Sequence, residues 1–120
     1  MIHIDTQYAI TLLKQVVEER GEGFSYKVPQ GATRCLYEWQ GSPSCGVGAA
    51  LHKAGVPVHV LAKLDDACGE IADDETREFL QENQVILTPD ATRVLWGFQG
   101  SQDNGANYAS ALRAALEHTD

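Results

Sequence analysis

The chain has 120 residues, of which 43% are hydrophobic and 22% are charged, and this composition is typical of a globular protein. Its formal net charge is −8, and residues 61–120 account for all of it, since they hold twelve acidic and four basic side chains. Binding to nucleic acid and to anionic membranes depends on a basic surface. We therefore expect no direct contact with either.

Length and cysteine content indicate one domain in a reducing compartment. No apolar run approaches the length that spans a bilayer, and residues 1–6 show no secretion signal. The odd number of cysteines, three, leaves at least one unpaired within the chain. We expect a single globular domain over residues 1–120, cytoplasmic, with reduced thiols.

The first predicted element is a helix over residues 6–20, where apolar residues recur at helical spacing. Asp5 or Thr6 is its expected N-cap, and Gly21 its end. Two alternating aromatic runs follow, over residues 24–29 and 33–39, and they flank a short turn that contains Gly31. This pattern predicts a β-hairpin.

The remaining segments predict further helices. Small residues over 45–54 indicate a helix that packs closely on another backbone, with Ser42 or Ser44 as its cap. Residues 56–61 fit either a strand or a helix, and we favour a helix. This helix is expected over residues 57–66, and the other predicted helical segments are 73–82, 89–100 with Thr88 as N-cap, and 107–118.

The predicted fold class is therefore α+β and mostly α, with four to five short helices packed on a two-stranded antiparallel β-hairpin. A lone hairpin is marginal in water, so its apolar face must cover the helices. The expected core comprises Leu13, Val16, Tyr26, Tyr37, Leu51, Leu61, Leu64, Leu95, Trp96, Leu112 and Leu116.

Cys45 is the first candidate for chemistry, because it stands where a loop enters a helix. The helix dipole stabilises a thiolate at such a position, and His52 or His59 would then act as base. The alternative is that Cys45 is a small apolar residue that packs the start of the helix. Two helical turns, about 10 Å of rise, separate Cys45 from His52 and weigh against the enzyme.

Metal and phosphate sites are weakly supported. Cys35, Cys45, His52, His59 and Cys68 are zinc-ligand types, but their spacings contain no tight pair of ligands. The glycine-rich run over 41–48 lacks the lysine of a phosphate-binding loop. We expect no metal and no cofactor.

An acidic run between residues 65 and 82 is the second candidate. An EF-hand is excluded because its first ligand would fall on Leu64. The run is either a solvated helix face or an interaction surface for a basic partner. The candidate interaction residues are Asp65, Asp66, Asp73, Asp74, Glu75 and Glu78.

A polar stretch between the last two predicted helices is open to two interpretations. Gln99, Gln102 and the residues up to Asn107 either line a polar cleft or cap helices.

Two patches of the sequence carry a resemblance. The first is Cys35-x-Tyr37 followed by Gly41-x-Pro43-Ser44-Cys45-x-Val47-Gly48-x-x-Leu51-x-x-x-Gly55-Val56; the second is Gln99-x-x-Gln102-Asp103-x-Gly105-x-x-Tyr108-x-x-Ala111-Leu112-x-x-Ala115. Together they resemble small uncharacterised proteins of actinobacterial bacteriophages and their hosts. The resemblance covers most of residues 8–116, and it implies an accessory phage protein that acts in the cytoplasm of a bacterial host.

The function expected from these observations is non-enzymatic binding of a host macromolecule, an unidentified host protein, through the acidic face. The alternative is a thiol-dependent enzyme with Cys45 as nucleophile. A further alternative is a homodimer in which the hairpin edge of one chain pairs with its twin.

Overall fold

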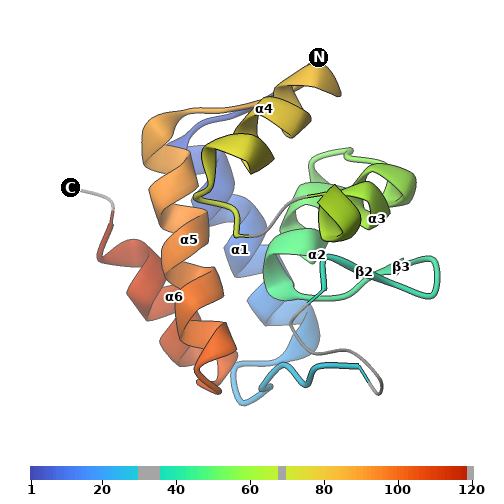
Figure 1. The fold of residues 1–120 in the computed structure, drawn as a ribbon. Helices are drawn as coiled ribbons and strands as arrows, with labels where there is room; N and C mark the ends of the chain where they lie inside the picture. Colours follow the sequence, from blue (N-terminus) through green and yellow to red (C-terminus); the bar gives the residue numbers. More distant parts are fainter. Residues whose placement is uncertain (30–35, 68–69, 119–120) are drawn as a thin grey trace.

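The computed structural model describes residues 1–29, 36–67 and 70–118, and all structural statements below concern these residues. They form an α+β fold with six helices, which is one more than the upper end of the expected range (Figure 1). The helices are α1 (Thr6–Arg20), α2 (Gly46–Lys53), α3 (Val58–Ala67), α4 (Asp74–Glu82), α5 (Pro89–Asp103) and α6 (Tyr108–Leu116). The strands are β1 (Ile2–Ile4), β2 (Glu38–Trp39), β3 (Ser42–Pro43) and β4 (Val85–Leu87).

Helix α5 lies at the centre of the helical packing. It contacts α1, α2 and α6, and Figure 1 shows α1, α5 and α6 beside one another with α2 and α3 on the other side of α1. Thr88 caps α5 as predicted, since its hydroxyl accepts a hydrogen bond from the Ala91 amide at 3.1 Å. None of the described helices is long and apolar enough to cross a membrane.

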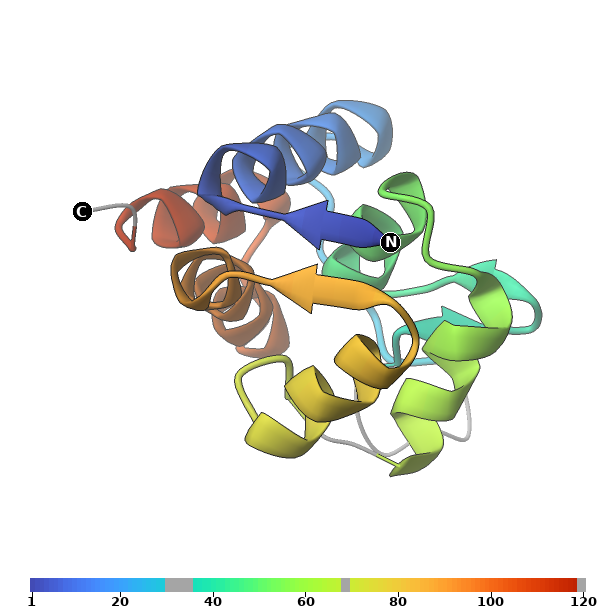
Figure 2. The same ribbon diagram turned by 90° about the horizontal axis from the view of Figure 1, so that it is seen from above.

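Strands β1 and β4 form a parallel pair that joins the start of the chain to its second half (Figure 2). Ile2 pairs with Val85 and Ile4 with Leu87, so the paired residues are more than eighty positions apart. The Ile2 amide donates to the Gln84 carbonyl at 2.8 Å, which begins the ladder. Neither β1 nor β4 is predicted from the sequence.

The β-hairpin is present, but its position differs from the predicted one. It is formed by β2 and β3 around Gln40 and Gly41, whose φ angles of 51° and 82° suit a two-residue turn between antiparallel strands. Residues 30–35 lie outside the described part of the chain. Residues 24–29 form no strand; their backbone instead meets the start of α6, where the Tyr108 amide donates to the Phe24 carbonyl at 2.8 Å.

The predicted helix boundaries agree well with the structure. Helix α1 spans the predicted residues, and Asp5 caps it by accepting from the Tyr8 amide at 2.8 Å. The ambiguous segment 56–61 is helical from Val58 onward. The N-cap of α2 is Cys45 itself, and the prediction of Ser42 or Ser44 is wrong.

Most of the predicted core is confirmed, with two errors. Trp96 and Leu116 are 41% and 37% exposed, so their placement in the core is wrong. Trp96 lies at the edge of α5, where its indole N–H donates to Glu70 at 3.4 Å. Tyr26 and Leu112 are only partly buried. The confirmed core residues are Leu13, Val16, Tyr37, Leu51, Leu61, Leu64 and Leu95.

Two buried glutamines of α5 connect separate parts of the chain. The Gln102 side-chain oxygen accepts hydrogen bonds from the Gly46 amide at 2.8 Å and from the Tyr108 hydroxyl at 3.0 Å. The Gln99 side chain accepts from the Ile71 amide at 2.9 Å and donates to the Tyr37 hydroxyl at 3.1 Å. Neither glutamine lines a cleft, as both side chains are buried.

The close backbone packing predicted for α2 is confirmed at Gly48. A Cβ atom at this position would overlap the backbone carbonyl group of Tyr37. We expect Gly48→Ala to lower the free energy of unfolding by about 1–3 kcal/mol, because a backbone neighbour cannot rotate away as a side chain would.

Gly100→Ala is the matched control, since a Cβ at this position of α5 meets nothing. The same substitution should there raise the free energy of unfolding by about 0.5–1 kcal/mol, through helix propensity. Urea unfolding of both variants measures the two effects. Equal effects of the two substitutions would contradict the packing argument.

Candidate functional site

The structure does not assemble the candidate thiol site. The Cys45 side chain is completely buried, and its sulfur accepts a hydrogen bond from the Gly48 amide at 3.4 Å. His52 and His59 are both exposed, and the His52 ring Nδ1 lies 3.1 Å from the Val56 carbonyl. No hydrogen bond joins Cys45 to either histidine in the described structure. Cys35 and Cys68 lie outside the described residues.

The acidic candidates separate into one structural residue and a surface group. Asp65 is 8% exposed, and its carboxylate accepts from the amides of Tyr37 at 2.8 Å and Glu38 at 3.0 Å. This carboxylate therefore holds the start of β2 against α3. The exposed candidates are Asp66 on α3 and Asp73, Asp74, Glu75 and Glu78 at the start of and along α4.

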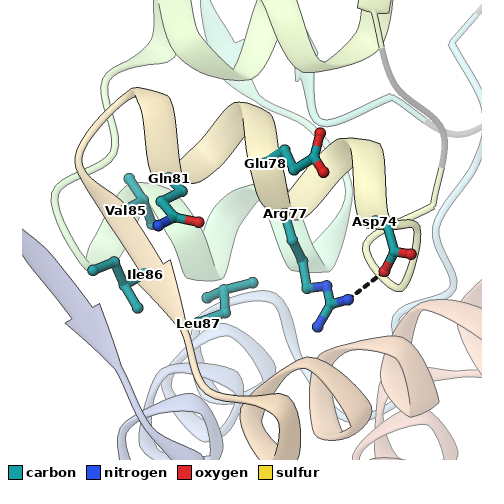
Figure 3. A pocket seen from close by; sticks show the side chains of 7 residues that line it. All are labelled: Asp74, Arg77, Glu78, Gln81, Val85, Ile86 and Leu87. Atoms are coloured by element: carbon teal, nitrogen blue, oxygen red, sulfur yellow. Dashed lines mark hydrogen bonds and ion pairs between the residues drawn. The ribbon is translucent and has the colours of Figure 1, made fainter.

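The acidic helix α4 borders a groove. The groove has a volume of about 380 Å³ and lies between α4 and β4. Figure 3 shows Arg77 and Gln81 reaching from the helix towards the side chains of the strand, and the ion pair of Arg77 with Asp74. Its lining residues are Asp74, Arg77, Glu78, Gln81, Val85, Ile86 and Leu87.

One edge of β4 has backbone groups that pair with no other described residue. In the parallel register, Ile86 directs its N–H and C=O towards β1, so Val85 and Leu87 direct theirs to the opposite side. Figure 2 shows β4 between β1 and α4, which places this second edge on the side of the groove. Within the described structure these groups of Val85 and Leu87 form no hydrogen bond.

A buried donor on α4 also lacks a partner. The Nε atom of Arg77 is buried, and it forms no hydrogen bond with the described residues. The guanidinium group is held in place by Asp74 at its other end. A buried donor without an acceptor is costly, so an acceptor supplied by a bound molecule would be stabilising.

The acidic charges of this groove could be predicted from the sequence, but its strand was not predicted. Arg77, Gln81 and residues 85–87 were not among the candidates. The sequence signal for the strand is the run Val85-Ile86-Leu87, three apolar residues of which two are β-branched. This run begins two residues after the helix end at Asn83.

Nothing in the described residues forms a metal centre: no group of three histidine, cysteine or acidic side chains is close enough to hold an ion.

Comparison of the chain with protein-family models, with curated proteins and with solved structures finds no match.

A buried phenol lies near Cys45. The Tyr108 hydroxyl accepts a hydrogen bond from the Arg20 guanidinium at 3.1 Å and donates to Gln102 at 3.0 Å. Burial raises the pKa of Tyr108 to about 12, although the positive charge of Arg20 opposes the shift. The phenol is therefore neutral at physiological pH, and Arg20 has no negative partner there.

The buried Cys45 predicts slow alkylation. We expect iodoacetamide to modify Cys45 at least about a hundredfold more slowly in the folded protein than in guanidinium chloride, because the thiol is reached only through opening of the structure. Mass spectrometry of the peptide that contains Cys45 measures both rates. Fast modification of Cys45 in the folded protein would contradict this and favour the thiol enzyme.

The raised pKa of Tyr108 predicts a loss of stability in alkali. Between the ordinary pKa of 10.0 and about 12, the unfolded chain loses the phenol proton while the folded chain keeps it. The free energy of unfolding must therefore fall as the pH rises through this range. Urea unfolding at a series of pH values measures the fall, and Tyr108→Phe should show a smaller one. An equal slope in both proteins would contradict the assignment.

Proposed function

We propose that this chain is a non-enzymatic binding protein that holds a basic, extended segment of a partner protein in the groove between α4 and β4. The observation that carries the proposal is the unpaired edge of β4 beside an acidic helix. Strand edges of this kind are completed by added strands in many peptide-binding proteins.

Charge supports a basic partner. Helix α4 contains four acidic residues and a single basic one, Arg77, which is already paired with Asp74. Glu78 lies on the groove and is exposed. Complementary charge accelerates association and excludes acidic competitors.

The strand edge supports an extended conformation for the bound segment. The N–H and C=O groups of Val85 and Leu87 have the spacing of a strand, and a bound backbone would pair with them. A carbonyl group of the same segment is the kind of acceptor that the buried Nε atom of Arg77 lacks. Backbone pairing would provide affinity, while the acidic side chains would select lysine or arginine.

The resemblance to small proteins of actinobacterial phages and their hosts sets the proposed context. We place the chain in the cytoplasm of a bacterial host, as an accessory protein whose partner is a host protein. A host protein that binds nucleic acid through a basic segment has the required chemistry, since α4 would offer it negative charge in place of phosphate.

The test uses a fluorescein-labelled peptide of alternating lysine and valine. Fluorescence anisotropy should show binding to the wild-type chain, and Glu78→Lys should weaken it about tenfold or more through like-charge repulsion. Glu18→Lys on α1 is the matched control, since it makes the same charge change at an exposed residue far from the groove in sequence. Equal weakening by both variants would contradict a site at α4.

Backbone pairing is tested separately. A peptide of the same sequence with an N-methyl group on every backbone amide keeps its charge but has no backbone N–H group to donate to the edge of β4. It should bind at least about tenfold more weakly. Equal affinity of the methylated and unmethylated peptides would show that charge alone is responsible and would overturn strand addition.

A further inference from the structure

A second groove, unrelated to α4 and β4, lies between the end of α1 and the β2–β3 hairpin. Its volume is about 780 Å³. The walls come from the extended segment after α1 and from the hairpin, and we call it the aromatic groove. The residues that matter here are Arg20, Phe24, Tyr26, Lys27, Trp39 and Pro43.

The aromatic groove presents aromatic surface to solvent. Phe24 and Trp39 are 38% and 39% exposed, although large aromatic side chains usually stabilise a protein by being buried. The Phe24 ring is held by an edge contact with the buried Tyr108 ring, at 4.9 Å between centroids. Tyr26 is fixed by a hydrogen bond of 2.7 Å between its hydroxyl and that of Ser44. These walls are therefore preformed for a flat apolar group.

The same groove holds a cation, Arg20, whose hydrogen-bond acceptors among the described residues are all neutral. The Arg20 guanidinium donates to the carbonyls of Ser44 at 2.6 Å and Pro43 at 3.3 Å, and to the Tyr108 hydroxyl at 3.1 Å. Among the described residues, no carboxylate forms an ion pair with Arg20. These three bonds leave two of its five N–H groups without an acceptor among the described residues.

The charged side chains among the described residues that line the groove are both basic, although the chain as a whole has a net charge of −8. Lys27 also lines the groove and is exposed, and no acidic side chain of the described residues lines it. Tyr108 keeps its proton, so it does not neutralise Arg20. A half-buried cation in a concave, partly apolar surface attracts an anion more strongly than an exposed one does.

We propose that the aromatic groove binds a small planar anion, with an aromatic ring against Phe24 and Trp39 and an acidic group beside Arg20 and Lys27. Phosphate and carboxylate both match the guanidinium fork. The ligand class is thus an aromatic molecule with one phosphate or one carboxylate, and the two arms of the test separate them.

The experiment is a titration of the purified chain followed by heteronuclear NMR. The probes are adenosine monophosphate, with adenosine and inorganic phosphate as its half-ligands, and naphthoate, with naphthamide and acetate as its half-ligands. Signals of Lys27 and of the Trp39 indole should shift with at least one whole probe, at an affinity at least about tenfold above that of either half-ligand. The probe that binds identifies the acidic group. Failure of both probes, or equal binding of the bound probe and its neutral half-ligand, would overturn the proposal.

Exposed residues serve as the variants, because Arg20 is part of the packing. Lys27→Glu and Trp39→Ala should each weaken the bound probe about tenfold or more. Their matched controls are Lys63→Glu on α3 and Trp96→Ala on α5, both also at exposed residues. Unchanged affinity in Lys27→Glu and Trp39→Ala, or an equal loss in the controls, would overturn the proposed site. Lys27→Glu and Trp39→Ala both lie outside α4 and β4. The test of the aromatic groove is therefore independent of the peptide experiment.

Discussion

The amide side chains of Gln99 and Gln102 hold four separate parts of the chain on α5. Gln102 fixes the first residue of α2 and the first residue of α6, and Gln99 fixes the segment before α4 together with Tyr37. All of these groups are buried or partly buried, and an amide or hydroxyl left unpaired in such a place costs about 1–3 kcal/mol. The two glutamines therefore determine where α2, α4 and α6 begin relative to α5. Apolar side chains fill the space between these helices.

Both proposed binding grooves depend on this arrangement. The bond from the Ile71 amide to Gln99 places the chain just before α4. The bond from Tyr108 to Gln102 continues to Arg20, which reaches the aromatic groove. One groove is acidic with an unpaired strand edge, and the other is basic with exposed aromatic rings. A chain of net charge −8 can present both because hydrogen bonds to Ser44, Pro43 and Tyr108 hold the Arg20 guanidinium at the aromatic groove.

The helices could be predicted from the sequence because their signals are local. Asp5 and Thr88 are N-caps in the sequence and in the structure, and the apolar stripe of α1 needs no knowledge of its neighbours. The hairpin was misplaced because the aromatic alternation over residues 24–29 has a different cause. The Phe24 ring packs on Tyr108, and the Phe24 carbonyl accepts a hydrogen bond from the Tyr108 amide. The backbone of this segment therefore pairs with the start of α6 and not with a second strand.

The acidic charge of the candidate site could be predicted from the sequence, but its shape could not. The carboxylates of α4 are visible in the composition of residues 61–120, but burial of Asp65 depends on β2 lying beside α3. The unpaired edge of β4 depends on the pairing of Val85 with Ile2, and three apolar residues alone specify neither a partner strand nor a register. This pairing directs the backbone N–H and C=O groups of Ile86 towards β1. The corresponding groups of Val85 and Leu87 therefore point towards the acidic helix. The property on which the proposed function rests is therefore a consequence of one long-range contact.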